Sequence, residues 1–527
     1  MKKFTFLCVL LVHYIAFHIA IAQKRAPRNF PEYGFFLNKQ QLYIQELLEF
    51  LRIPSVSASS EHLKDVQAAA EWLKNRMLGA GIPNVQIFQV GQYPLVYASI
   101  AAAVPQAPTV LIYGHFDVQP ASVEDGWNIT KPFKPRMIQD KIYARGASDD
   151  KGSLLSVVHA VEAILAVSQG RSPVNIKFLF EGQEEIGSPD LPNWLLKNRK
   201  LVQSDLLVSA DGSMYSENTG SIVWGLRGAG AVQVNVTGPS HDLHSGGFGG
   251  VVQNPIHCLV HLLESMRYEN GSIAIEGFYQ GTRPITQKEK DLSRQSAKEL
   301  ETELSRLSGV SQLVGGESNH FDIVERLWFR PTLDVVGIWG GYTDQGIKTV
   351  LPANAYAKLS FRLVQEQIPE QVVEKVIQHV HLHCPVGCTC EAFDLGFHAL
   401  PFESDPDMLG NQVLRETLLD IYQGEEPKYV RSGASIPLIG FIQKEFQIPA
   451  VFLAFGLPDE NIHGPNEFYR IGSMDKARRA YVSFLYHLGE RYQWERNAKK
   501  PEETPSVSVT ATTSTSMKEM EMDHSEL

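Results

Sequence analysis

Short apolar runs alternate with helical patterns along most of the chain. The segments 36–80 and 153–167 place apolar residues three and four positions apart, which predicts amphipathic helices. The apolar runs that lie between helical patterns are VQIFQV, TVLIYG, VNIKFLF, SDLLVSA and, much later, AVFLAFG. Strands separated by helices predict an α/β fold with a mostly parallel sheet that helices cover on both faces.

The pattern changes after the segment GLRGAG at 225–230. AVQVNVTG alternates apolar and polar residues, and it is followed by a helical segment, by further strand-like runs and by the amphipathic segment 369–383. This order predicts an inserted α+β domain at 229–396 with an antiparallel sheet. The α/β pattern then resumes, so we expect the first domain to comprise residues 36–228 and 397–495.

The two ends of the chain have compositions of their own. Two lysines, an apolar run and the small residues up to Ala22 are typical of a signal peptide at 1–22, and a membrane anchor is the alternative for this segment. The tail at 500–527 is rich in Ser, Thr, Pro and Glu, which predicts disorder. We therefore expect a secreted protein without a membrane partner.

The net charge and the cysteine content further restrict the class of protein. The net charge of -11 and the pI near 5.9 argue against a nucleic-acid partner, which requires a basic surface. Removal of the signal peptide leaves four cysteines, whose pairing the sequence does not determine: Cys258, Cys384, Cys388 and Cys390. Disulfides or free thiols are favoured over a structural metal there. Three sequons, at Asn128, Asn235 and Asn270, predict a glycoprotein if the host is a eukaryote.

Acidic residues and histidines follow the ends of the predicted α/β strands. TVLIYG leads to His115 and Asp117, and SDLLVSA leads to Asp211. The other positions of this kind are Glu181, Glu184 and Glu185 after VNIKFLF, His463 after AVFLAFG, and Asp149 and Asp150 before the helix at 153–167. Because the carboxyl ends of parallel strands meet at one edge, these side chains would collect there. Unneutralised carboxylates would repel one another, and two divalent cations remove that problem.

Each of these residues, taken singly, has a simpler structural interpretation. His115 alone is more often a hydrogen-bonded structural histidine, and Asp149 and Asp150 alone are as well explained as helix-capping charges. Glu184 and Glu185 alone are more often part of a solvated loop. Their joint arrival at successive strand ends is what favours a two-metal site, for which mixed His and carboxylate ligands suit zinc, manganese or cobalt.

Eight motifs, in this order, resemble those of the carnosinase-like di-metal peptidases, a family that includes related aminoacylases and carboxypeptidases. The motifs are YGHFDVQP, GWNITKPF, ARGASDDKGS, EGQEEIGS, GLRG, DLHSG, SGASIP and HGPNE. The resemblance runs from about residue 40 to 492. It implies a peptidase that hydrolyses dipeptides or short peptides with a free C-terminal carboxylate, with two divalent metal ions per subunit, zinc or alternatively manganese.

The resemblance also implies a role for each matching residue. His115, Glu185, Asp211 and His463 would bind metal, and Asp149 would bridge both ions. Glu184 would be the general base toward a metal-bridging water, and Asp117 would orient His115. The residues alone did not distinguish Glu184 from Glu185, or Asp149 from Asp150.

The resemblance also assigns roles to residues outside the metal site, most of them in the predicted inserted domain. His244 of DLHSG resembles a residue that reaches from the partner subunit to stabilise the oxyanion, so a homodimer formed through the inserted domain is expected. Thr349 and Arg362 resemble residues that hold the substrate carboxylate, and Ser435 of SGASIP would line the same pocket. Gln365 and the sequence SADGS depart from the family pattern and put the side-chain preference in doubt. The rival functions are an aminoacylase and a non-catalytic binding protein.

Overall fold

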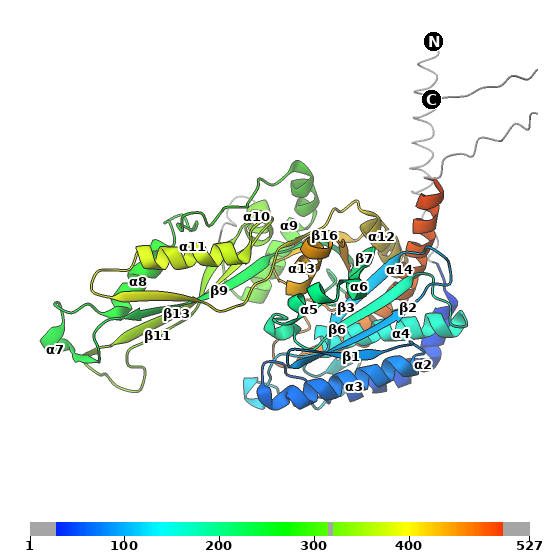
Figure 1. The fold of residues 1–527 in the computed structure, drawn as a ribbon, viewed down its shortest axis with the longest axis horizontal. Helices are drawn as coiled ribbons and strands as arrows, with labels where there is room; N and C mark the ends of the chain where they lie inside the picture. The colour runs from blue at the N-terminus through cyan, green and yellow to red at the C-terminus, as the bar shows by residue number, and fades with distance from the viewer. Residues whose placement is uncertain (1–27, 315–319, 499–527) are drawn as a thin grey trace, which may run out of the picture.

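The structure is a computed structural model that describes residues 28–314 and 320–498. The predicted signal peptide at 1–22 and the predicted tail at 500–527 lie outside the described residues. The described chain forms two lobes, a larger one built on a mostly parallel sheet and a smaller one that extends away from it (Figure 1). No helix within the described ranges is long and apolar enough to cross a membrane.

The larger lobe is built on a six-stranded sheet in the order β1-β2-β6-β3-β7-β17. The strands β6, β3, β7 and β17 run parallel, and β1 and β2 add an antiparallel edge. The bounds of the six strands are Gln86–Val90 (β1), Tyr93–Ile100 (β2), Thr109–His115 (β3), Asn175–Glu181 (β6), Leu206–Ser209 (β7) and Ala450–Phe452 (β17). The predicted α/β fold class is therefore confirmed, although β2 was not expected.

Helices cover both faces of this sheet, which explains why its strands are continuous apolar runs. Val110 and Ile112 of β3 face one core, and Leu111 and Tyr113 face the other. The first core is closed by α2 (Pro31–Phe50), α3 (Leu63–Gly79), α4 (Gly152–Val167), α12 (Leu409–Ile421) and α14 (Ile471–Ala498). The second is closed by α5 (Leu191–Lys197), α6 (Arg199–Val202) and α13 (Pro437–Phe446). The expected helical segment 36–80 is thus two helices separated by a loop.

The smaller lobe contains a four-stranded antiparallel sheet in the order β11-β13-β9-β14. Its strands are β9 (Gly228–Thr237), β11 (Thr332–Gly340), β13 (Asn354–Leu363) and β14 (Thr389–Asp394). Alternate residues of β13, from Ala355 to Leu363, are buried beneath α8 (Pro255–Ser265) and α11 (Pro369–Leu382), and the residues between them face away from this core. Two disulfides, Cys258–Cys388 and Cys384–Cys390, pair the cysteines that the sequence left unassigned.

Shorter elements complete the described chain. At the junction of the lobes, β8 (Ser221–Leu226) pairs with β15 (Phe402–Glu403) and β16 (Lys428–Ser432), and α9 (Gln287–Ser308) and α10 (His320–Phe329) pack nearby. The far end of the smaller lobe carries β10 (Leu243–His244), β12 (Val350–Leu351) and α7 (Ser245–Phe248). The remaining elements are β4 (Arg136–Ile138), β5 (Lys141–Tyr143), β18 (Phe468–Arg470), and the short turns η1 (Ser60–His62), η2 (Val123–Asp125), η3 (Ala147–Lys151) and η4 (Glu184–Ile186).

Candidate two-metal active site

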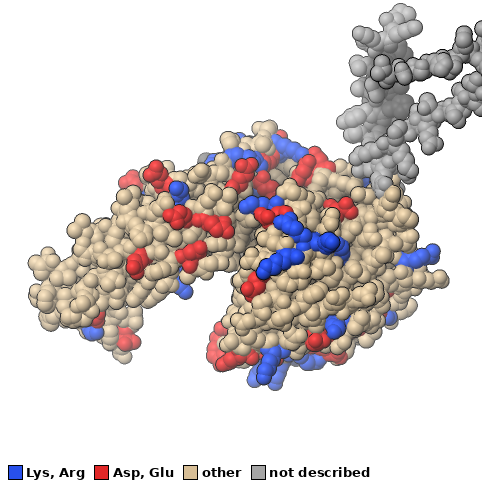
Figure 2. Space-filling view, viewed as in Figure 1, with Lys and Arg blue, Asp and Glu red and all other residues tan. Residues whose placement is uncertain are grey.

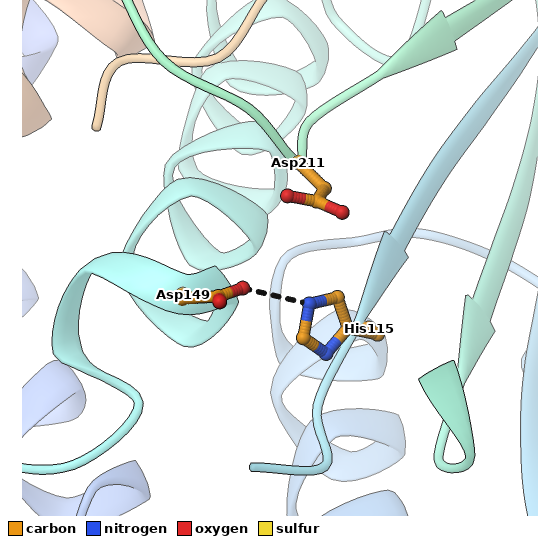
Figure 3. A group of neighbouring side chains, drawn as sticks. All are labelled: His115, Asp149 and Asp211. Atoms are coloured by element: carbon orange, nitrogen blue, oxygen red, sulfur yellow. Dashed lines mark hydrogen bonds and ion pairs between the residues drawn. The ribbon is translucent and has the colours of Figure 1, made fainter. Parts of the chain in front are cut away.

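The sheet topology brings the predicted strand-end residues to one edge. His115 is the last residue of β3, and Asp211 follows the neighbouring strand β7 by two residues. Glu184 and Glu185 lie in η4, which begins three residues after the end of β6, the strand that pairs with β3 on its other side. Asp149 approaches from η3, the turn that leads into α4. Figure 3 shows His115, Asp149 and Asp211 pointing toward a common centre.

Asp149 is shared by two groups of possible metal ligands. Its Oδ1 lies 3.0 Å from Nε2 of His115, and its Oδ2 lies 2.9 Å from Nε2 of His463. The first group is His115, Asp149 and Asp211, and the second is Asp149, Glu185 and His463. Within each group the ligand atoms lie within 4.8 Å of one another. One carboxylate therefore faces an imidazole with each of its two oxygens.

These distances fit divalent ions. Two ligand atoms that each lie about 2.1 Å from a tetrahedral zinc ion are roughly 3.4 Å apart. The spacing of 3.2 Å between Nε2 of His463 and Oε2 of Glu185 is close to that value. The donor set of imidazoles and carboxylates also matches ions of the zinc and manganese kind. The residues present can hold two ions with Asp149 between them.

The charges of the cluster also favour the binding of two cations. Desolvation, together with the Asp149 carboxylate, raises the pKa of Asp211 to about 7. Hydrogen bonds to Asp149 and Glu185 raise the pKa of His463 to about 10. Four mutually close carboxylates, counting Glu184, have only two imidazoles to compensate them. Positive charge is what the site lacks, and a pair of divalent cations supplies it.

The structure separates Asp149 from Asp150. Asp150 is buried, and its Oδ2 accepts a hydrogen bond from the backbone N–H of His115 at 3.2 Å. Burial raises its pKa well above the ordinary value, which favours the neutral acid. Asp149 instead turns its carboxylate toward the two imidazoles. The geometry therefore favours Asp149 as the bridging residue and gives Asp150 a supporting position behind His115.

Asp117 lies behind the cluster and is fully buried. Its two carboxylate oxygens accept the backbone N–H groups of Glu184 and Glu185, at 3.2 and 3.1 Å. Nδ1 of His115 lies 3.1 Å from the backbone carbonyl oxygen of Asp117 and 3.4 Å from its carboxylate. The carboxylate therefore holds the Glu184–Glu185 turn at least as firmly as it holds the imidazole, which the strand pattern did not reveal.

Glu184 and Glu185 have different surroundings. The carboxylate of Glu185 accepts hydrogen bonds from the backbone and side-chain amides of Gln119 and contacts His463. The carboxylate of Glu184 accepts no hydrogen bond within the described ranges. Burial and the neighbouring Asp211 and Glu185 raise the pKa of Glu184 well above its ordinary value, although His115 opposes this. A carboxylate without a fixed partner and with a raised pKa is suited to proton transfer.

The site residues predicted in the inserted domain lie at two separate places in the smaller lobe. His244 caps α7 at the far end of the smaller lobe (Figure 1), and Thr349 lies beside it, because its carbonyl oxygen accepts the N–H of Ser245 at 3.0 Å. Arg362 lies at the other end of the four-stranded sheet of the smaller lobe, where its Nη1 donates to Oγ of Ser435 at 2.8 Å. From Asn354 to Arg362 alone, β13 spans about 27 Å at roughly 3.4 Å per residue. Within one chain, Thr349 therefore does not meet Arg362.

Arg227, to which no role was assigned from the sequence, joins Arg362 at the junction of the lobes. It precedes β9 by one residue, and Arg362 pairs with Ala229 in the register of β9 and β13. The two guanidinium groups therefore share a face of the sheet, and both reach the SGASIP loop, since Nε of Arg227 donates to the carbonyl oxygen of Gly433 at 3.3 Å. Neither forms a salt bridge within the described residues. The arginine of the GLRG motif, to which no role was assigned, was the signal in the sequence that could have identified Arg227 as a site residue.

Fold and site together define a class of protein, the two-metal hydrolases built on an α/β sheet. The model of peptidase family M20/M25/M40 matches residues 111–487. The chain is 31% identical over 472 residues to the Cys-Gly metallodipeptidase DUG1 of Saccharomyces cerevisiae, covering 85% of this chain and 95% of the relative. It is 30% identical over 475 residues to the human Beta-Ala-His dipeptidase, covering 86% and 91%.

Solved structures agree with these relatives. The structure of the di-peptidase Dug1p from Saccharomyces cerevisiae superposes with a TM-score of 0.76 at 28% identity, over 87% of this chain and 98% of that one. Human carnosine dipeptidase 1 gives a TM-score of 0.75 at 27% identity, with the same coverage. The chain belongs to the peptidase family M20/M25/M40 and is a metallopeptidase that requires two metal ions. The predicted family is confirmed, while the roles of single residues stay predictions.

Proposed function

We propose that this protein is a secreted dipeptidase that hydrolyses dipeptides or short peptides with a free C-terminal carboxylate, using two zinc ions. The observation that carries the proposal is the position of Asp149, whose two oxygens face His115 and His463 from one turn. A carboxylate so placed can bridge two ions. The named activities of the relatives, on Cys-Gly and β-Ala-His dipeptides, support a dipeptide substrate.

The proposed mechanism assigns metal binding to His115, Asp149, Glu185, Asp211 and His463. When bound, the two ions lower the pKa of water and polarise the scissile carbonyl. Glu184 takes a proton from the attacking water and delivers it to the leaving amine, which its unpartnered carboxylate allows. Asp117 keeps Glu184 in place through its backbone N–H. Glu184 is thus the catalytic base, and Asp117 is a positioning residue.

The substrate carboxylate would be bound where the two lobes meet. Arg362 and Ser435 are already in contact there, and Arg227 adds a second guanidinium on the same face. Both guanidinium groups are partly or fully buried and form no salt bridge within the described chain, with Asp334 as the acidic residue that acts on both from a distance, so an anionic group is a suitable complement. Comparing a dipeptide with its C-terminal amide tests this point. We expect the amide to be hydrolysed at least 100-fold less efficiently in kcat/KM, and equal efficiency would refute the carboxylate requirement.

The active form is proposed to be a homodimer in which His244 acts on the partner's substrate. In one chain, the α7 end of the smaller lobe lies far from the catalytic sheet (Figure 1). The outer part of that lobe shows few charged side chains on the face in Figure 2. The edge strand β11 also exposes a run of large apolar residues, Val335, Val336, Ile338 and Trp339. Thr349, beside His244, would arrive at the partner's site together with it.

Mixing two inactive variants tests action across the interface. His244→Ala should retain both metal ions but lose most turnover, and Glu184→Gln should behave in the same way. In heterodimers of the two variants, one site combines the intact Glu184 of one chain with the intact His244 of the other. Random mixing should therefore restore about a quarter of wild-type activity. No recovery in demonstrated heterodimers, or a fully active monomer, would contradict the proposal.

Metal content and products decide between the proposed function and its rivals. Metal analysis of the purified protein, with a dipeptide panel and an N-acetyl amino acid at equal concentration, separates a dipeptidase from an aminoacylase. We expect zinc to be retained, with manganese as the alternative ion, and dipeptides to be preferred. A protein that stays inactive after zinc or manganese is restored would overturn the proposal.

Secretion is supported by the two disulfides, which pair every cysteine of the described chain. Such bonds persist in oxidising compartments and are rare in the cytosol. Glycosylation at the sequons would follow from that route in a eukaryotic host, and Asn128 and Asn270 are the exposed acceptors. Expression in a secreting cell line, with recovery of the protein from the medium and sequencing of its N-terminus, tests the route. Retention of the protein inside the cell would contradict it.

A further inference from the structure

Glu467 is a fully buried carboxylate four residues after His463. Its Oε1 accepts the backbone N–H groups of Ser148 and Asp149, at 3.0 and 3.2 Å. Its Oε2 accepts the backbone N–H of Gly146 at 3.0 Å. One side chain therefore accepts three backbone N–H groups between Gly146 and the shared residue Asp149.

The fourth donor to Glu467 connects this turn to the other side of the site. Nη1 of Arg145 donates to Oε2 of Glu467 at 2.8 Å, and the ion pair is almost completely buried. Nη2 of the same guanidinium donates to the backbone carbonyl oxygen of His463 at 3.0 Å. Arg145 and Glu467 thus form a clamp between the backbones of Asp149 and His463, which are 314 residues apart in the sequence.

The clamp lies just beyond the end of a strand pair. β5 and β18 pair as far as Tyr143 and Phe468, and the N–H of Ala144 donates to the carbonyl oxygen of Glu467 at 3.1 Å, which brings the two segments together but does not fix the positions of Asp149 and His463.

Neither Asp149 nor His463 lies in a regular strand or helix, and His463 has a φ of 61°, a left-handed conformation that a histidine rarely adopts without outside support. The second group of ligands, formed by Asp149, Glu185 and His463, needs its donor atoms at a spacing that fits one ion. The first group takes His115 and Asp211 from the ends of paired strands, which hold them without the clamp.

We propose that Glu467 is a positioning residue that sets the affinity of the metal site formed by Asp149, Glu185 and His463. The inference rests on the proposed metal roles of those three residues. Loss of the carboxylate leaves backbone N–H groups buried without an acceptor and frees Arg145 from its partner, so Asp149 and His463 are no longer held at a fixed position beyond the β5–β18 pair. The metal site built from both loops weakens, while the site built on strand ends is affected less.

Glu460 offers a matched control. It is a second fully buried carboxylate that contacts the same turn, accepting from Oγ of Ser148 at 2.6 Å, from the N–H of Leu457 and from Arg470. It bonds to neither the backbone of Asp149 nor Arg145. Glu460→Gln therefore reproduces the loss of a buried charge without opening the clamp.

The experiment is a calorimetric titration of the metal-free full-length protein with Zn²⁺, which resolves the affinities of the two ions without any substrate. Glu467→Gln should weaken one of the two ions by 10- to 100-fold and leave the other within about threefold. Glu460→Gln should leave both affinities unchanged. Two wild-type affinities in Glu467→Gln, or an equal loss of both, would overturn the inference.

A second variant guards against a folding failure. Arg145→Lys keeps the charge but loses the fork that joins Glu467 to His463, and we expect the same selective loss of one ion. Unaltered affinities in Arg145→Lys would count against the clamp. Because the readout is metal binding, a protein that proves inactive on dipeptides would refute the proposed function and leave this test standing.

Discussion

Replacement of Asp117 by Asn changes one atom at the back of the site. Each oxygen of the buried carboxylate accepts one backbone N–H, from Glu184 and from Glu185. An asparagine offers a single carbonyl oxygen, so its NH₂ group must face one of those two donors. The variant therefore loses one charge-assisted hydrogen bond, about 1.5–3 kcal/mol, and leaves a buried donor unpaired, about 1–3 kcal/mol.

The loss destabilises the turn η4, which carries Glu184 and Glu185 after the end of β6. If about 1.4–2.8 kcal/mol of the loss reaches the metal site, zinc affinity falls 10- to 100-fold. We expect turnover to stay at least tenfold low after zinc is restored, because Glu184 is displaced as well. Zinc titration of the metal-free protein and steady-state kinetics at saturating zinc measure the two effects.

Asp205→Asn is a suitable control for Asp117→Asn. Asp205 also accepts a backbone N–H, from Thr109 at 2.7 Å, but it lies exposed at the opposite end of β3. We expect zinc affinity and turnover in this variant to stay within about threefold of wild type. If Asp117→Asn matched this control in both measurements, the supporting role of Asp117 would have to be abandoned.

Two further predictions concern the base and the insertion. Glu184→Gln should lower kcat at least 1000-fold while both metal ions remain bound; metal analysis beside kinetics checks this, and a variant retaining a tenth of the activity would exclude Glu184 as base. Removal of Cys258–Cys388, which closes a sequence separation of 130 residues, should cost about 5 kcal/mol in the chain-entropy model, against about 2.4 kcal/mol for Cys384–Cys390 with a separation of 6. Thermal unfolding of the two paired Cys→Ser variants compares these losses, and an equal or reversed order would contradict the model.

The sequence by itself determined the architecture of the larger lobe and the location of its site. Alternating apolar runs and helical patterns require a parallel sheet, and parallel strands have their carboxyl ends at one edge. His115 and Asp211 end such strands, so their meeting followed from the pattern alone. The strands β9, β11 and β13 of the smaller lobe were readable too, because one buried face imposes strict alternation on β13, whereas β14 was not expected. The strand β2 was missed, although it is eight residues long and mostly buried, because it follows β1 without a helix between them and so lay outside the alternating pattern.

The tertiary structure decided what depends on the direction of a side chain. Asp149 and Asp150 are adjacent and chemically identical, and only the turn before α4 aims one at the imidazoles and the other at a backbone N–H. The pairing of the cysteines likewise depends on which strand lies beside which helix. Thr349 and Arg362 were both expected to hold the substrate carboxylate, yet β13 separates them to opposite ends of the smaller lobe. Sequence patterns report burial and period, whereas such separations arise from how distant segments pack.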